Sequence, residues 1–355
     1  MNRENRTVCD DAREIFSALG DELSCRIYEE RVLHSLTGDL RPLRRILLLT
    51  EEGKAFQDAL HLLPAGVPRL IYGAGERGAY LPFWWDSHFT AYIDADERKQ
   101  GTRLNGLRIY ALEDALKEYP DAAIIITNRY GFDEIEQMLL AKGVRENRII
   151  NFARLDHALE KKQYFDLAEL PHVKEECFVD GGTFDGASSL AFKDWCGADY
   201  SHVYAFEPDA ANRFLCECAF SANLPAGSYD VVPKGLWETG EELTFSSGDG
   251  YVSSFRDDGK ETVPVISMDE ALHGKRVTFL KLDIEGAEYA ALRGARNILL
   301  EQQPKCAISV YHKPEDIFVL PKFLREVYPQ AVFYFRHYVL REYDTVMYVV
   351  TGKGQ

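Results

Sequence analysis

The chain has 355 residues and a formal net charge of −16, because 57 aspartates and glutamates outnumber 41 lysines and arginines. Its length predicts about two domains, and 46% hydrophobic residues can bury real cores, which excludes a disordered chain. Since so negative a surface repels phosphate backbones and anionic bilayers, we expect neither a nucleic-acid partner nor a membrane partner.

The N-terminal segment, residues 1–66, is predicted to be a helical cap. Apolar residues recur there at helical spacing, with Ile15, Leu19, Leu23 and Ile27 on one face. We expect three or four helices, and none of them carries a recognisable chemical motif.

The cysteines and the first residues predict the compartment. Seven cysteines stand at irregular spacing, and the charged start of the chain lacks the apolar stretch of a secretory leader. No apolar run approaches the roughly 20 residues that span a bilayer. We therefore expect reduced thiols and a cytoplasmic location.

Residues 67–153 are predicted to form a small Rossmann-like α/β domain. Strands over 69–75, 89–96 and 121–128 alternate with helical patterns such as 132–143. This alternation is typical of a parallel sheet whose strands are connected by helices.

A glycine cluster follows the first of these strands. Gly73, Gly75 and Gly78 form G-x-G-x-x-G where the strand passes into a helix, and Asp94 ends the next strand. Such glycines let backbone amides approach a phosphate, and the acid can hold ribose hydroxyls. We predict a second nucleotide or nucleotide-sugar site here; the alternative is a tight turn kept for packing. The region resembles the small Rossmann-like domains that precede some sugar-modifying transferases.

Residues 154–175 are expected to be a charged helical connector, and residues 176–355 a second α/β domain. Its predicted parallel strands cover 177–182, 202–208, 229–236, 277–286 and 306–312. The last two strands, 331–338 and 345–352, are expected to pair antiparallel across a short polar turn. An inserted hairpin precedes the fourth strand. Its loop, with Asp249 and Tyr251, is either a lid over a substrate or a solvated turn.

The turn after the first strand of this second domain is rich in glycine. Asp180, Gly181, Gly182 and Gly186 stand where the strand passes into a helix. Such a turn admits the amino-acid part of S-adenosylmethionine against bare backbone. Glu207 ends the second strand, 27 residues after Asp180, where a carboxylate can accept both ribose hydroxyls of a cofactor.

The fourth strand ends in carboxylates. Asp283, Glu285 and Glu288 follow it at the C-terminal edge of the sheet, where open α/β folds bind ligands. These acids could equally cap the following helix, since acids favour a helix N-terminus. A divalent metal is a weaker alternative, so no metal is predicted.

Four motifs within residues 175–350 resemble those of one family. VDGGTFDG, AFEPD, SMDEAL and KLDIEGAEYAALRGA are similar to the motifs of the FkbM family of S-adenosylmethionine-dependent methyltransferases. The resemblance implies a class I methyltransferase fold and O-methylation of a sugar or natural-product hydroxyl. It also implies that the glycine-rich turn lines the cofactor and that Glu207 holds its ribose. The predicted cofactor site is Asp180, Gly181, Gly182, Thr183, Asp185, Gly186, Glu207, Pro208 and Asp283.

Catalysis by such an enzyme needs alignment and a proton acceptor. Methyl transfer is an in-line displacement from a sulfonium that is already a good leaving group, so alignment and exclusion of water carry much of the task. A hydroxyl acceptor also benefits from a general base. His312, at the end of the fifth strand, has the most suitable unperturbed pKa, and Asp283 and Glu285 are the alternatives.

We therefore expect a methyltransferase that uses S-adenosylmethionine to methylate a hydroxyl of a sugar, sugar nucleotide or small natural product. The alternative is a nucleotide-sugar binding or scaffold protein whose methyltransferase-like domain holds a ligand without catalysis. The expected partner is a small-molecule or glycan acceptor, and a homodimer is left open.

Overall fold

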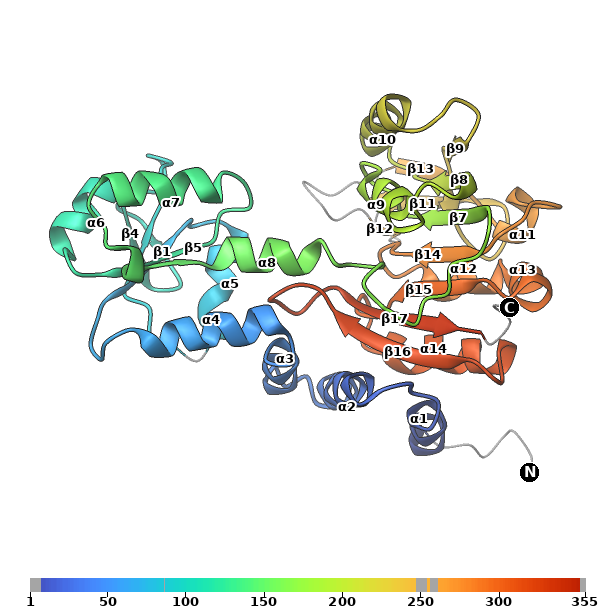
Figure 1. Ribbon diagram of the computed structural model, residues 1–355, viewed down its shortest axis with the longest axis horizontal. Helices are drawn as coiled ribbons and strands as arrows, with labels where there is room; N and C mark the ends of the chain where they lie inside the picture. The colour runs from blue at the N-terminus through green and yellow to red at the C-terminus, as the bar shows by residue number, and fades with distance from the viewer. Residues whose placement is uncertain (1–7, 86, 247–253, 256–260, 352–355) are drawn as a thin grey trace. The chain divides into compact units, whose positions relative to one another are not determined.

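The computed structural model describes residues 8–85, 87–246, 254–255 and 261–351. Two compact units make up the chain (Figure 1). Unit 1 comprises residues 1–37, 163–336 and 343–355, and unit 2 comprises residues 38–162 and 337–342. The loop of the inserted hairpin, with Asp249 and Tyr251, lies outside the described residues.

Unit 1 is built on a seven-stranded sheet with the order β16-β17-β15-β14-β7-β8-β9. The strands are β7 (Glu176–Gly181), β8 (Tyr200–Phe206), β9 (Tyr229–Val232), β14 (Phe279–Leu282), β15 (Lys305–Ser309), β16 (Val332–His337) and β17 (Thr345–Val350). The pairs β9–β8, β8–β7, β7–β14 and β14–β15 are parallel, and β17 runs antiparallel to β15. The parallel strands are therefore as predicted, and β16 and β17 are neighbours in the sheet, as the predicted hairpin requires.

The helices of unit 1 connect and cover these strands (Figure 1). They are α1 (Val8–Phe16), α2 (Glu22–Thr37), α9 (Ala187–Trp195), α10 (Ala210–Asn223), α11 (Met268–Ala271), α12 (Glu288–Arg293), α13 (Arg296–Gln302) and α14 (Asp316–Val327). A small second sheet has the order β10-β13-β11-β12. Its strands are β10 (Gly235–Leu236), β11 (Glu241–Ser246), β12 (Ser254–Phe255) and β13 (Glu261–Ile266).

An aromatic core fixes α9 on the sheet of unit 1. The ring of Phe178 in β7 stacks on Phe192 in α9, with centroids 4.4 Å apart. Phe279 in β14 meets Phe178 edge-on at 5.4 Å, and all three side chains are buried. Because β7 and β14 pair in parallel, the C-terminal ends of the two strands lie at one edge of the sheet.

The N-terminal residues lie against β16 in unit 1. Leu19 forms a parallel β-bridge with Phe333, and the Phe335 amide donates to the Ser24 hydroxyl at 2.9 Å. The structure thus divides the residues expected to form one cap, because residues 1–37 belong to unit 1 and residues 38–66 to unit 2. Helical periodicity predicted the helices but not their packing partners.

Unit 2 contains a six-stranded sheet with the order β3-β4-β2-β1-β5-β6. Its strands are β1 (Arg69–Tyr72), β2 (Ala91–Ile93), β3 (Arg103–Leu104), β4 (Leu107–Tyr110), β5 (Ala123–Ile126) and β6 (Ile149–Asn151). Its helices are α3 (Arg41–Leu47), α4 (Glu51–Leu62), α5 (Glu76–Trp84), α6 (Leu112–Glu118), α7 (Phe132–Ala141) and α8 (Phe152–Glu160). The helical part of the expected connector ends at Glu160. The short strands β3 and β4 were not predicted.

Among the described residues, no helix combines the length and the apolar composition that crossing a lipid bilayer requires.

Candidate functional site

The glycine-rich turn of unit 1 starts at the end of β7 and leads into α9. Gly182 has a φ of +74°, and a β-carbon there would lie 1.9 Å from the Asp283 carbonyl oxygen. Gly186, with a φ of +87°, approaches the Phe220 ring so closely that a β-carbon would lie 2.8 Å from it. Since both positions combine a left-handed backbone with a close neighbour, glycine is the residue that fits.

Gly182→Ala should destabilise unit 1 more than an alanine at an open left-handed position. Gly227 has a comparable φ of +83° but no heavy atom within 4 Å of an added β-carbon. Both variants carry the left-handed cost of about 1–2 kcal/mol, and Gly182→Ala adds roughly 1–3 kcal/mol for the steric conflict. Urea unfolding of both variants measures the difference, and equal losses of stability would contradict the close approach.

A buried ion pair between Asp180 and Lys281 stabilises this turn. Asp180 is fully buried, and its Oδ1 lies 3.0 Å from the Lys281 Nζ in β14. The Lys281 ammonium also donates to the Gly182 carbonyl at 2.7 Å. The other carboxylate oxygen accepts from the hydroxyls of Ser188 and Ser189 at 2.6 Å. Because the protein's own groups occupy both oxygens of Asp180, the geometry favours a role in holding the turn.

Two further predicted side chains stabilise the same turn. The Thr183 hydroxyl donates to Asp180 Oδ2 at 3.0 Å and is 2% exposed. The Asp185 carboxylate accepts at 3.1 Å from the amide of Ala187, the first residue of α9. These contacts leave the backbone of the turn as the surface that a cofactor would meet.

Glu207 joins the end of β8 to the glycine-rich turn. Its Oε2 accepts from the Phe184 amide at 3.0 Å, and its Oε1 accepts from the Asp209 amide at 2.9 Å. Burial raises the pKa of the Glu207 carboxyl above its usual value, although these amides oppose the shift. The carbonyl of the next residue, Pro208, accepts from Arg213 at 3.3 Å. Each carboxylate oxygen of Glu207 keeps a lone pair with which it can accept a ligand hydroxyl.

The three predicted catalytic residues come together at the ends of β14 and β15. His312 Nε2 lies 3.4 Å from Asp283 Oδ1 and 3.6 Å from Glu285 Oε2. On its other side, His312 Nδ1 lies 3.0 Å from Glu288 Oε1. The imidazole therefore lies among three carboxylates. Two of them, Asp283 and Glu285, are the alternative general bases that the sequence suggested.

The neighbouring carboxylates and the burial of the cluster shift the pKa values of His312 and Glu285. Burial lowers the pKa of His312, but the carboxylates of Glu288, Asp283 and Glu285 outweigh it and raise that pKa to about 10. Burial raises the pKa of Glu285 to about 7, although the charge of His312 opposes the shift. At neutral pH the imidazole thus holds its proton, which favours Glu285 over His312 as the group that accepts one.

Tyrosines orient Asp283. The Tyr164 hydroxyl donates to Asp283 Oδ2 at 2.7 Å, and the Tyr311 hydroxyl donates to Oδ1 at 3.1 Å. The sequence did not single out Tyr164, because it precedes β7 and stands far from Asp283 along the chain. Lys281 did leave a signal that was not used: a lysine within the apolar strand β14 requires a buried partner.

The glycine cluster of unit 2 also forms a tight turn. Gly73 has a φ of +109°, and a β-carbon on Gly78 would lie 1.9 Å from the Gly73 carbonyl oxygen. Gly75 is the N-cap of α5, and no heavy atom lies within 4 Å of a β-carbon added there. Asp94 Oδ2 accepts from the Ala74 amide at 2.8 Å, which ties the turn to the end of β2. These contacts explain Gly73 and Gly78 by packing but give no such reason for Gly75, and nucleotide binding at this turn stays a prediction.

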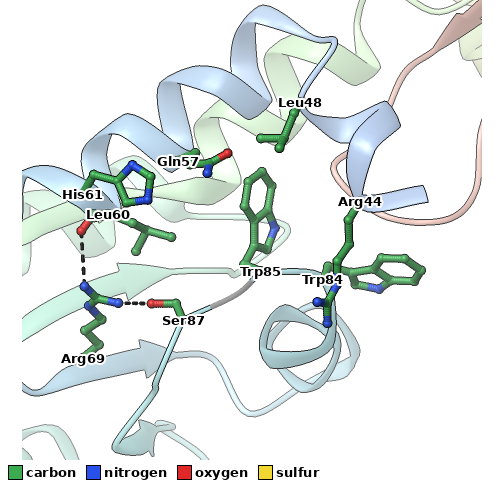
Figure 2. Close-up of a pocket in the computed structure, with 9 residues that line it drawn as sticks. All are labelled: Arg44, Leu48, Gln57, Leu60, His61, Arg69, Trp84, Trp85 and Ser87. Atoms are coloured by element: carbon green, nitrogen blue, oxygen red, sulfur yellow. Dashed lines mark hydrogen bonds between the residues drawn. The ribbon is translucent and has the colours of Figure 1, made fainter. Parts of the chain in front are cut away.

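A pocket of about 110 Å³ lies at the opposite end of β1 in unit 2 (Figure 2). It is lined by Arg44, Leu48, Gln57, Leu60, His61, Arg69, Trp84, Trp85 and Ser87. Arg69, the first residue of β1, donates to the Ser87 hydroxyl and to the Leu60 carbonyl (Figure 2). Since Gly73 follows the other end of β1, this pocket and the glycine turn are separate features.

Comparisons with known proteins bear on both the sequence and the fold. The sequence profile of the Methyltransferase FkbM domain matches residues 180–335. Among solved structures, the chain is similar to methyltransferase FkbM from Methylobacillus flagellatus KT. That match has 20% sequence identity and a TM-score of 0.53, and covers 84% of this chain and 99% of that chain.

More distant matches follow. An rRNA methylase from Streptococcus thermophilus matches at 14% identity and a TM-score of 0.34, over 52% of this chain and 91% of its own. A precorrin-6y C5,15-methyltransferase from Geobacter metallireducens GS-15 matches at 10% identity and a TM-score of 0.33, over 56% and 86%. The comparison with curated proteins gives no match.

Proposed function

We propose that the protein uses S-adenosylmethionine to methylate a hydroxyl of a sugar, sugar nucleotide or other small molecule, because residues 180–335 match the Methyltransferase FkbM domain. The observation that carries the proposal is the bond between the Phe184 amide and Glu207 Oε2, 3.0 Å long. It holds a buried carboxylate against a glycine-rich turn at the edge where the carboxylate–imidazole group also lies.

The residues of this edge fit such a cofactor. Gly182 and Gly186 leave bare backbone where a side chain would intrude, which suits the amino-acid part of the cofactor. Glu207 offers lone pairs to two ribose hydroxyls, and a carboxylate is a strong acceptor for both. When bound, S-adenosylmethionine supplies a methyl group on a sulfonium, which is its own leaving group.

The protein's share of the reaction is positioning and proton transfer. Asp283, oriented by two tyrosine hydroxyls, can accept a hydrogen bond from the acceptor alcohol and fix its direction. The half-buried carboxylate of Glu285 is placed to take the proton that leaves this hydroxyl. With the cofactor bound, its methyl group would pass to the hydroxyl oxygen as the sulfur–carbon bond breaks, and Glu285 would hold the proton that the hydroxyl loses.

Calorimetry and a turnover assay test this function. The full chain should bind S-adenosylmethionine at one site per chain and, with a panel of nucleotide sugars and free sugars, release S-adenosylhomocysteine. Absence of heat with S-adenosylmethionine would overturn the proposal. Binding of a nucleotide sugar without any methyl transfer would instead favour the binding or scaffold protein.

A further inference from the structure

The carboxyl edge of the sheet in unit 1 brings three metal-ligating side chains together. Asp283 follows β14, Glu288 opens α12 and His312 follows β15. One oxygen or nitrogen atom of each lies within 4.8 Å of the others. Bonds from a divalent cation to such atoms are about 2.0–2.4 Å long, so two ligands of one ion lie at most roughly 4.8 Å apart. The three atoms therefore satisfy the distance limit for sharing one ion.

His312 is a buried ring between carboxylates. Its side chain is 8% exposed, and Nδ1 lies 3.0 Å from Glu288 Oε1, but neither ring nitrogen makes a hydrogen bond of suitable geometry to a described residue. Nε2 faces Asp283 Oδ1 at 3.4 Å and Glu285 Oε2 at 3.6 Å. These separations exceed hydrogen-bond length but are ordinary for two ligands of one ion. Nε2 thus faces two carboxylates across a separation that a water or an ion can bridge.

Glu288 supplies a second unpartnered atom. The side chain is fully buried, and its Oε2 has no hydrogen-bond partner among the described residues. Its Oε1 accepts from the Ile284 amide at 2.9 Å, in the turn that precedes α12, so the side chain does not fill the helix-capping role that the sequence favours for these acids. This bond occupies one oxygen and leaves Oε2 without a hydrogen bond.

Asp283 does not cap the helix either. Its two oxygens accept from the hydroxyls of Tyr164 and Tyr311, which come from outside α12. Carboxylates that bind metals are commonly held by hydrogen bonds of this kind from a surrounding shell of side chains. The tyrosines thus give Asp283 a fixed orientation toward the cluster.

The cluster holds more carboxylates than positively charged groups, so a cation there would be attracted. Asp283, Glu285 and Glu288 bring three carboxylates to one imidazole. The ammonium of Lys281 is held by Asp180 and by two backbone carbonyls, and that of Lys313 donates to the Gly286 carbonyl. A divalent ion would replace the imidazole proton, because a histidine binds metal in its neutral form.

We propose that Asp283, Glu288 and His312 bind one divalent cation, with Glu285 beside it. One imidazole nitrogen with carboxylate oxygens suits Mn²⁺, Fe²⁺ or Zn²⁺ better than Ca²⁺, whose preferred ligands are all oxygens. The role of the ion rests on the proposed function. There it would hold the acceptor hydroxyl as a Lewis acid and make its proton easier to transfer to Glu285.

Binding of Mn²⁺ to the full chain, freed of metal by dialysis against a chelator, tests the site. Electron paramagnetic resonance should count one bound ion per chain, and Asp283→Asn should weaken its binding by about 10–100-fold or more. Asp269→Asn is the matched control, because Asp269 instead caps α13 through the amides of Asn297 and Ile298. Equal Mn²⁺ affinity in the two variants would overturn the proposal.

The native chain gives a second readout that needs no variant. Electron spin-echo modulation of the bound Mn²⁺ should detect one coordinated imidazole nitrogen, and its absence would overturn the assignment of His312. S-adenosylmethionine binding is measured on the same sample. A chain that binds the cofactor but no Mn²⁺ overturns the metal site alone. A chain that binds Mn²⁺ but no cofactor overturns the proposed function alone.

Discussion

Lys281→Met will lower the free energy of unfolding of unit 1 by about 3–5 kcal/mol. The substitution removes the cation that lies 3.0 Å from Asp180 Oδ1, and both side chains of the pair are almost wholly buried. The remaining carboxyl group would then be buried without its positive partner, which costs far more than the pair contributes. Hydrogen exchange of amides in β7 and β14 measures the loss within unit 1.

An exposed lysine of the same unit provides the control. Lys322 pairs with Asp11 at 2.8 Å, and its side chain is 41% exposed. Lys322→Met should cost less than about 1 kcal/mol, because solvent screens such pairs. Adding Asp180→Asn to Lys281→Met removes the uncompensated charge and should restore part of the stability. If Lys281→Met lowers the free energy of unfolding no more than Lys322→Met does, the ion pair between Lys281 and Asp180 is not formed as described.

Glu207→Ala should weaken the binding of S-adenosylmethionine by about 100-fold or more, since hydrogen bonds to a charged group contribute roughly 1.5–3 kcal/mol each. The variant loses the acceptor for two ribose hydroxyls and also leaves the Phe184 amide without its partner in the turn. Calorimetry with S-adenosylmethionine measures the effect.

Glu217→Ala is the matched control, because Glu217 is exposed on α10. It should leave the affinity unchanged. Unfolding curves of both variants show whether unit 1 remains folded. A folded Glu207→Ala protein with native affinity would contradict the assignment of the cofactor site.

Local patterns in the sequence predicted most of the fold. The glycine-rich turns, the acids at strand ends and the antiparallel end of the sheet all leave signals within a few residues, such as Gly182 beside Asp180. They follow from backbone geometry and from side-chain alternation, both of which are local. The parallel sheet of unit 1 and its position relative to the motifs were therefore predictable.

What the sequence did not reveal depends on contacts between distant residues. The unperturbed pKa of His312 made it the preferred base, but the structure surrounds it with Asp283, Glu285 and Glu288 and raises its pKa to about 10. Tyr164 reaches Asp283 from a segment that precedes the whole sheet. No periodicity or spacing encodes such approaches, because they arise only when the strands are assembled.

The segment that lies along β16 has a consequence for solubility. A strand at the end of a sheet presents unpaired amides and carbonyls that can recruit another chain. Here the Gly20 amide donates to the Phe333 carbonyl, and the Phe333 amide donates to the Ala18 carbonyl, both at 2.9 Å. These bonds occupy backbone groups of Phe333, in a strand that is otherwise rich in aromatic residues. The residues around Leu19 therefore act as a cover that protects this strand from pairing with other molecules.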